Sequence, residues 1–472
     1  MVAGLISFPI LTRIFSVADY GTLGLVTTTI TIAIAITKMG FPNAIVRFYE
    51  ESKASNRLVN YFSTMFFSSL FTAAVVTVLF VIVLQLLPAG ILNNRFSMLL
   101  SLASILIFTR CTCGILTSFL RAEQRTKLYN LIGIFNRYGS LACSIFLVFF
   151  IIKKGLYGFF IGQIIVSIIM LSFLLIVYRG RIKIGLQYFC PAELKRAVRF
   201  GFPLLWAEMG HLILSYADRY FIQLYLGSAA LGLYTAGYNL TTYVTEVVIY
   251  PINYAMTPIY MNILVTQGER QTKEFLTKLF TYFLLVMIPA VFGFIAVGKD
   301  LITFLASAKY AEVYLILPYI VIGQAVYACT IILNSGLFIN KKTFVVTYVM
   351  SGASILNIIL NSVLIPLYGI LGAAQATLVS YLFYAVVLTY CSMREFSFKI
   401  EYRRICFYLL ASGIMFFIVR RINFPSSLTT FLVKVPVGAL IYAIAVVFFD
   451  QEIRCKSALF FKGLKSSILL GR

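Results

Sequence analysis

Residues 97–120 read SMLLSLASILIFTRCTCGILTSFL, an almost wholly apolar run with a single charge, Arg110, near its middle. About twenty such residues cross the roughly 30 Å hydrocarbon core of a bilayer as one helix. The rest of the chain has the same character, because 61% of its 472 residues are hydrophobic and only 12% are charged. Soluble domains carry about 25% charged residues. The composition therefore excludes a soluble globular protein.

Similar apolar runs recur along the chain and predict an all-α polytopic membrane protein with about fourteen transmembrane helices. The first run has only about twelve apolar residues before Arg13, so we expect that the chain begins upstream or that this helix is short. The predicted spans are residues 1–14, 20–44, 59–87, 97–120, 128–152, 156–178, 200–226, 230–262, 275–297, 311–337, 344–367, 369–392, 403–419 and 428–449.

The charge balance is strongly basic, with 39 Lys and Arg against 16 Asp and Glu. Loops on one side of the predicted membrane hold 26 of these cations, and loops on the other side hold 8. By the positive-inside rule, this difference predicts that both termini lie in the cytoplasm. The cations then face the anionic inner leaflet of the plasma (cell inner) membrane, and no nucleic-acid partner is needed to explain them.

The two halves of the chain repeat one pattern at an offset of about 210 residues. Arg13 and the turn from Asp19 to Gly24 correspond to Arg219 and the turn from Gly227 to Gly232. Each copy holds six spans, so the copies share one orientation, which is typical of transporters with a substrate site between parallel halves. The predicted organisation is a six-helix bundle at 1–178, a cytoplasmic linker at 179–199, a second six-helix bundle at 200–392, and two extra helices with a basic tail at 393–472.

Several short motifs carry a resemblance: Arg13-Ile-Phe-x(3)-Asp-Tyr-Gly-x-Leu-Gly-Leu, Phe-Gly-Phe-Pro at 200–203, Ala-Asp-Arg at 217–219 and Leu-Gly-Leu-Tyr at 231–234. The chain resembles the polysaccharide-transporter branch of the multidrug/oligosaccharidyl-lipid/polysaccharide (MOP) superfamily, the Wzx-like flippases of O-antigen, capsule and exopolysaccharide units. The resemblance implies a V-shaped pair of bundles, as in multidrug and toxin extrusion (MATE) proteins, that works by alternating access. It implies an undecaprenyl-diphosphate-linked oligosaccharide as substrate, with polysaccharide polymerase and chain-length proteins as candidate partners.

Cations inside the spans are the candidate substrate-binding residues, namely Lys38, Arg110, Arg137 and Arg219. A charge at the bilayer centre costs about 2.5–3.5 kcal/mol on insertion scales, so it normally faces a cavity or a partner. Helical spacing places Arg110 on one stripe with Gly114, Thr117 and Arg121, and Arg137 on another with Asn130, Gly133, Ser140 and Ser144. Arg suits a phosphate, although both arginines could instead bond neighbouring carbonyls. Lys38 could extend its ammonium to the interface, and we expect Lys434 to do so.

The seventh span carries the densest polar stripe, formed by Glu208, His211, Ser215, Asp218 and Arg219. One interpretation is a proton or sodium coupling site, for which Glu208, His211, Asp218 and, in the next span, Glu246 are candidates. The other is structural, with Asp218 and Arg219 fixing the ends of helices. The structural interpretation is favoured for Asp218 and Arg219, and both stay open for Glu208 and His211.

The sign of the charges also bears on other functions. A multidrug antiporter for cationic drugs should line its cavity with acids. Here the residues inside the spans of the first half are basic, and the corresponding residues of the second half are neutral, namely Asn334, Ser354, Asn357 and Asn361. A polymerase or glycosyltransferase needs catalytic groups outside the membrane. The predicted outer loops hold only three acids, and the sequence has no phosphate-binding loop. We therefore expect a transporter and not an enzyme, with no cofactor and no metal ligands.

Overall fold

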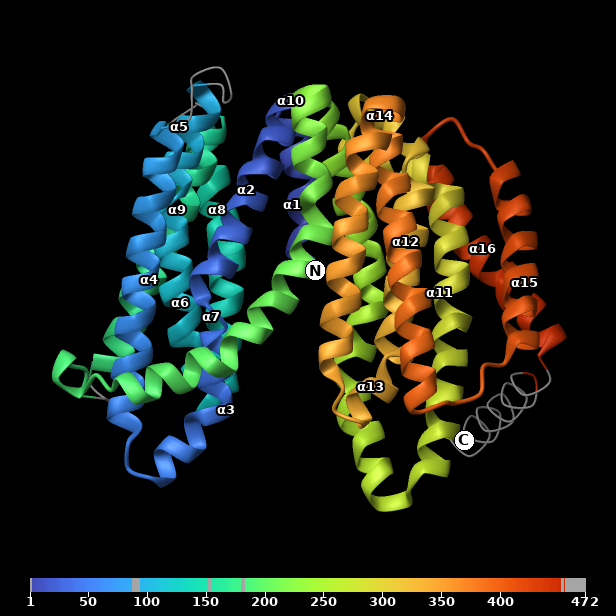
Figure 1. The fold of residues 1–472 in the computed structure, drawn as a ribbon. Coiled ribbons are helices and arrows are strands. Elements are labelled where there is room, and N and C mark those ends of the chain that lie inside the picture. The colour runs from blue at the N-terminus through green and yellow to red at the C-terminus, as the bar shows by residue number, and fades with distance from the viewer. Residues whose placement is uncertain (1, 87–93, 152–154, 180–182, 451–453, 455–472) are drawn as a thin grey trace, which may run out of the picture. The chain divides into compact units, whose positions relative to one another are not determined.

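The computed structural model describes residues 2–86, 94–151, 155–179, 183–450 and 454, and among these no strand occurs. In Figure 1 most helices run along one common direction within each part of the chain, whereas the start of α10 (Pro191–Gln267) runs across the helices beside it. The first helices of the chain are α1 (Val2–Ile14), α2 (Val17–Lys38), α3 (Phe41–Ala54), α4 (Leu58–Leu86), α5 (Asn94–Ala103), α6 (Ile105–Ala122), α7 (Thr126–Ile134), α8 (Ser140–Phe146) and α9 (Leu156–Arg179).

The second part of the chain contains the longer helices. These are α10 (Pro191–Gln267), α11 (Glu269–Ala306), α12 (Leu317–Leu333), α13 (Ser335–Ile339), α14 (Thr343–Glu395), α15 (Tyr402–Arg421) and α16 (Ser427–Phe449). Two π-helical turns, η1 (Phe135–Gly139) and η2 (Leu147–Ile151), flank α8. Two 3₁₀ segments, η3 (Leu186–Tyr188) and η4 (Ala308–Leu315), precede α10 and α12.

The predicted all-helical membrane fold is confirmed, because the described residues of the predicted spans are almost entirely helical. Ten helical segments of the described chain are long and apolar enough to cross a membrane. The predicted spans 344–367 and 369–392 are joined in α14, which is kinked at Gly369. Likewise α10 contains the predicted spans 200–226 and 230–262, separated at Gly227. Both glycines have positive φ, which a residue without a Cβ adopts at little cost.

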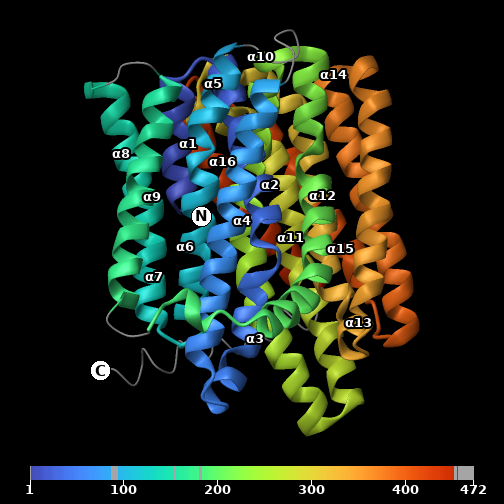
Figure 2. The same cartoon turned by 60° about the vertical axis from the view of Figure 1, so that its left-hand side comes forward.

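Packing divides the chain into two compact units, called here the N-terminal unit (Ala18–Tyr220) and the C-terminal unit (Met1–Val17 with Phe221–Arg472). In the N-terminal unit, α6 packs against α3, α4 and α9. Its core is aromatic. The centroid of the Phe62 ring lies 4.3 Å from the Phe119 ring centroid and 4.9 Å from the Tyr178 ring centroid. In the C-terminal unit, α11 packs against α12, α15 and α16, as Figures 1 and 2 also show.

These units differ from the predicted bundles at both ends of the first repeat. Helix α1 packs against α11 and so joins the C-terminal unit. The first thirty residues of α10 instead join the N-terminal unit, where Gly201 lies against the backbone of Gly40 and Arg219 reaches Thr28. The close approach of Gly201 and Gly40, which a hydropathy count does not register, explains the second exchange. Much of the predicted basic tail, at 451–453 and 455–472, lies outside the described residues.

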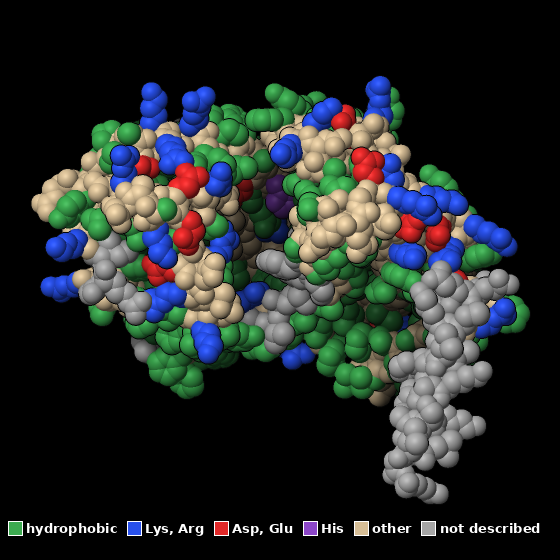
Figure 3. All heavy atoms as spheres, turned by 90° about the horizontal axis from the view of Figure 1, so that it is seen from below, with side chains coloured by type: hydrophobic (Ala, Val, Ile, Leu, Met, Phe, Trp, Pro, Cys, Tyr) green, Lys and Arg blue, Asp and Glu red, His purple; other side chains and the backbone are tan. Residues whose placement is uncertain are grey.

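Exposed cations gather at one end of each unit (Figure 3). In the N-terminal unit they follow the ends of α3 and α6, at Arg47, Lys53, Arg57, Arg121 and Lys127. In the C-terminal unit they occupy the start of α11 and the turn between α13 and α14, at Arg270, Lys341 and Lys342. These residues belong to the loops in which the sequence concentrates its positive charge.

Gly232 provides a direct test of the packing of the C-terminal unit. A Cβ on Gly232 would overlap the carbonyl oxygen of Val17. We expect Gly232→Ala to destabilise the protein by about 1–3 kcal/mol, the usual cost of overpacking. Gly413→Ala is the matched control, since a Cβ there meets nothing within 4 Å and alanine is the better helix former. Thermal unfolding in detergent measures the stability of both variants. Equal stability of Gly232→Ala and Gly413→Ala would contradict this packing.

Candidate functional site

Arg110 lies near the middle of α6, half-buried inside the N-terminal unit. Its Nη2 donates a hydrogen bond to Oε1 of Gln163, which α9 contributes. The Nε atom of Arg110 is buried and has no hydrogen-bond partner among the described residues. A guanidinium with a free donor inside a membrane helix bundle can hold an anion, because its donors are arranged to match phosphate oxygens.

Lys38, the last residue of α2, lies beside the same stripe of α6. A Cβ on Gly114 would stand 3.2 Å from Lys38 Cε and 3.7 Å from Nζ, so the absence of a side chain at Gly114 makes room for the lysine. Gly114 is one helical turn after Arg110. The two predicted cations are therefore neighbours, and among the described residues no carboxylate forms an ion pair with either of them. No acid among the described residues therefore compensates the charge of this pair.

Arg137 lies apart from this pair, on the π-helical turn η1, and is exposed. The predicted stripe around it is divided: Asn130, Gly133 and Arg137 are exposed, whereas Ser140 and Ser144 are buried. Ser144 donates a hydrogen bond of 2.8 Å to the carbonyl oxygen of Phe159. A π turn rotates the following residues away from regular α-helical spacing, which explains the division. Within the described residues no contact joins Arg137 to Lys38 or Arg110.

The polar stripe of the seventh span also separates into two parts. Glu208 and His211 are exposed, whereas Asp218 and Arg219 are buried. Arg219 donates a hydrogen bond of 2.7 Å to Thr28 on α2, and its guanidinium carbon lies 4.7 Å from the centre of the Tyr216 ring. These contacts tie the first part of α10 to α2 and favour the structural interpretation for Arg219. Glu246 is half-buried in the C-terminal unit.

The C-terminal unit has neutral polar groups where the first half has cations. Asn357 and Asn361 on α14 are fully buried, and Asn361 Nδ2 donates a hydrogen bond of 2.8 Å to Asn357 Oδ1. Asn357 Nδ2 and Asn361 Oδ1 have no hydrogen-bond partner among the described residues. Ser354 is buried one turn earlier and bonds the Met350 carbonyl oxygen. At these positions of α14 the C-terminal unit therefore carries neutral amides and a hydroxyl.

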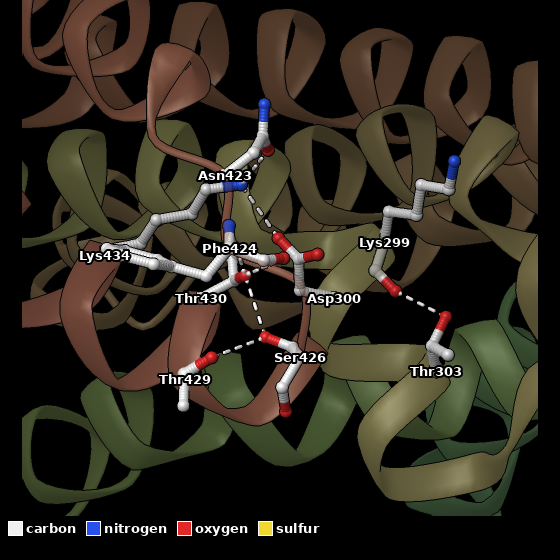
Figure 4. Close-up of polar contacts among 9 residues, drawn as sticks. All are labelled: Lys299, Asp300, Thr303, Asn423, Phe424, Ser426, Thr429, Thr430 and Lys434. Atoms are coloured by element: carbon white, nitrogen blue, oxygen red, sulfur yellow. Dashed lines mark hydrogen bonds and ion pairs between the residues drawn. The ribbon is translucent and has the colours of Figure 1, made fainter.

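The prediction for Lys434 is wrong. Its side chain is only 5% exposed, and its Nζ forms an ion pair of 2.8 Å with Asp300 on α11 (Figure 4). Asn423, in the turn between α15 and α16, lies 3.5 Å from the same ammonium. The ammonium of Lys434 does not extend freely into solvent, because it is paired with Asp300 near the end of α11. Asp300 is one of the few acids in the predicted outer loops, and its rarity there could have identified it as a partner for Lys434.

Gln163 is a site residue that the sequence analysis missed. It lies in the apolar α9 and accepts the hydrogen bond from Arg110. A lone amide in a membrane span was a weak signal, because its partner on α6 is 53 residues away in the chain. Three-dimensional packing alone brings the two side chains together.

The fold and these charges define a class of protein. The described residues contain ten long apolar helical segments, as in a polytopic membrane protein, and uncompensated cations inside such a protein are typical of a path for a charged solute. The chain belongs to the polysaccharide biosynthesis protein family, whose model matches residues 10–315. No curated protein matches the chain in sequence.

Solved structures with the same fold come from the MOP superfamily. The lipid II flippase MurJ in an inward closed conformation has a TM-score of 0.78 at 16% identity, covering 96% of this chain and 97% of its own. An inward-facing multidrug resistance MATE transporter has a TM-score of 0.62 at 15% identity, covering 84% of this chain and 98% of its own. A mutant of the Vibrio cholerae MATE transporter VcmN has a TM-score of 0.56 at 13% identity, covering 83% of this chain and 98% of its own. At these identities the likeness establishes the fold, and the family match confirms the predicted relation to polysaccharide biosynthesis proteins.

The Lys434–Asp300 pair can be tested by its charge balance. Removing one partner of a buried ion pair leaves an uncompensated charge and costs about 3–5 kcal/mol, whereas replacing both by apolar residues is often neutral. We expect Lys434→Met and Asp300→Leu each to lower the thermal unfolding midpoint in detergent, and the double variant to recover most of the loss. Additive losses in the double variant would show that the two residues act independently.

Proposed function

We propose that this protein is a flippase for an oligosaccharide linked to undecaprenyl diphosphate, a repeat unit of O-antigen, capsule or exopolysaccharide. In this proposal it carries the unit from the cytoplasmic to the outer leaflet of the plasma membrane by alternating access. Membership of the polysaccharide biosynthesis family and the fold shared with a lipid II flippase support the general class. Lys38 and Arg110 support the substrate.

The observation that carries the proposal is the cation pair on α2 and α6. Two positive charges without an acidic partner are costly in a membrane interior, and a bound anion would offset that cost. A diphosphate supplies two or more negative charges and several acceptor oxygens, which match the Nε donor of Arg110 and the ammonium of Lys38. Arg137, exposed on its π turn, is assigned to the same path as a further phosphate or acidic-sugar contact.

The multidrug interpretation is the second candidate, because MATE transporters share the fold. A cationic drug is repelled by uncompensated Lys and Arg and requires acids in their place. The charges of the N-terminal unit therefore favour an anionic substrate. The exposed acid Glu208, beside His211, is the feature that a cation exporter would also use.

Ion coupling is assigned to the polar groups of α10. Glu208 and His211 are exposed and one turn apart, so both are accessible to a proton or to sodium. Glu246 is a further coupling candidate, whereas Asp218 and Arg219 are assigned to holding α10 against α2. The orientation proposed has both termini in the cytoplasm, with the cation-rich ends of Figure 3 facing the inner leaflet. A polysaccharide polymerase and chain-length proteins are the proposed partners that consume the product.

Substitution of the cations tests the substrate assignment. We expect Arg110→Ala, Lys38→Ala and Arg137→Ala each to lower surface polysaccharide in cells by roughly ten- to a hundredfold, since a hydrogen bond to a charged group is worth about 1.5–3 kcal/mol. Lipid-linked units should accumulate on the cytoplasmic leaflet while the protein remains inserted and abundant. Arg95→Ala is the control, because Arg95 pairs with Asp19 at the other end of the helices. Normal polysaccharide with increased drug sensitivity would favour the multidrug interpretation.

Glu208→Gln tests the coupling assignment. Loss of the titratable carboxyl should make transport in proteoliposomes insensitive to an imposed proton or sodium gradient, while the protein still binds its substrate. Glu274→Gln serves as control, since Glu274 is exposed and pairs with Arg270 one turn away. A variant whose transport follows the gradient as the parent protein does would assign Glu208 to structure instead.

A further inference from the structure

The C-terminal unit contains an apolar chamber of about 610 Å³, a size typical of ligand sites. Its wall is formed by α11, α15 and α16, with Leu5 of α1 and Leu240 and Val244 of α10. Of the described residues that line it, Lys434 alone is charged. The hydroxyl of Tyr442 is already used, because it donates a hydrogen bond to the Leu285 carbonyl oxygen. The wall therefore offers hydrocarbon surface and suits a hydrocarbon occupant.

The shape of the chamber limits that occupant. Its lining on α11 extends from Pro289 to Leu305, a distance of about 24 Å at 1.5 Å per residue. One leaflet of a bilayer is about 15 Å deep, half of the hydrocarbon core. Small residues, Gly293 and Ala290 on α11 and Gly438 and Ala439 on α16, leave the space open. The chamber is therefore long enough to take one acyl chain of a membrane lipid.

One end of the chamber is polar and positively charged. There Asp300 is neutralised by Lys434 (Figure 4), and Arg13 donates to the carbonyl oxygen of Phe304, a residue of the chamber wall. Arg420 and Arg421 are exposed and directly follow Val419, another wall residue. The predicted outer loops hold only eight cations, yet five of them are in the segments around this end: Arg13, Lys299, Lys309, Arg420 and Arg421.

We propose that the chamber is a binding site for an anionic phospholipid of the surrounding bilayer. One acyl chain lies between α11, α15 and α16, and the phosphate lies on Arg420 and Arg421. The buried Lys434–Asp300 pair closes the end of the chamber without using the charge of those arginines. Such a lipid joins the α15–α16 hairpin to α11 and stabilises the unit by binding only the folded state. With both termini in the cytoplasm, the headgroup belongs to the outer leaflet.

The experiment uses the full chain purified in detergent, with dioleoylphosphatidylglycerol or dioleoylphosphatidylcholine added back. We expect phosphatidylglycerol to raise the unfolding midpoint, and native mass spectrometry to show one molecule bound per chain. Arg420→Gln/Arg421→Gln should weaken this binding roughly thirtyfold, from about 1 kcal/mol for each cation near an anionic headgroup. Arg403→Gln, an exposed cation at the opposite end of α15, is the matched control.

A second variant tests the chamber itself. Gly293→Leu fills it, since the nearest atom to a Cβ there is Met415 Cε at 3.9 Å. Gly413→Leu adds the same volume to α15 outside the chamber wall. Loss of the phosphatidylglycerol effect in Gly293→Leu alone supports the site. Equal stabilisation of both variants, or equal effects of the two phospholipids, would overturn it, and so would selective retention of undecaprenyl phosphate, which would assign the chamber to the carrier lipid.

Discussion

The hydrocarbon interior of a bilayer offers no water to polar groups, and this constraint determines the rest of the structure. Backbone groups satisfy it by forming helices across the described parts of the predicted spans. Charged side chains meet it in three different ways. Lys434 is paired with Asp300, Arg219 is bonded to Thr28 and stacked on Tyr216, and Lys38 and Arg110 have no acidic partner among the described residues. Only the third arrangement needs something from outside the chain, which is why the proposed substrate site is there.

Helix α10 shows how the same constraint separates structural polar residues from functional ones. Its first part belongs to the N-terminal unit and its remainder to the C-terminal unit, and the division falls between Tyr220 and Phe221. Asp218 and Arg219 are buried just before this point, whereas Glu208 and His211 are exposed further back. A helix shared by two units must be held where it leaves the first. The buried polar contacts at that point therefore have a structural explanation.

Much of the fold could be predicted from the sequence, because hydropathy and loop charge report directly on the membrane. The α6 stripe keeps the expected spacing as far as Gly114, since one regular helix connects it to Arg110. The stripe on α7 and α8 does not, because a π turn between them changes the spacing. The partners Gln163 and Asp300 depend on contacts across 53 and 134 residues of chain. Helical periodicity carries no information about such distant contacts.

The two copies of the repeat keep their helices but differ in the polar groups they bury. The first copy has Lys38 and Arg110 on its interior helices, whereas the second has Asn357 and Asn361, which bond each other and leave one donor and one acceptor unused among the described residues. A buried cation requires an anion, while an amide is satisfied by any hydroxyl or water. An oligosaccharide linked to a diphosphate likewise has two chemically different parts, with negative charge at one end and hydroxyl groups at the other. A small cationic drug has neither feature, and so the divergence of the copies supports the proposed lipid-linked glycan over such a drug.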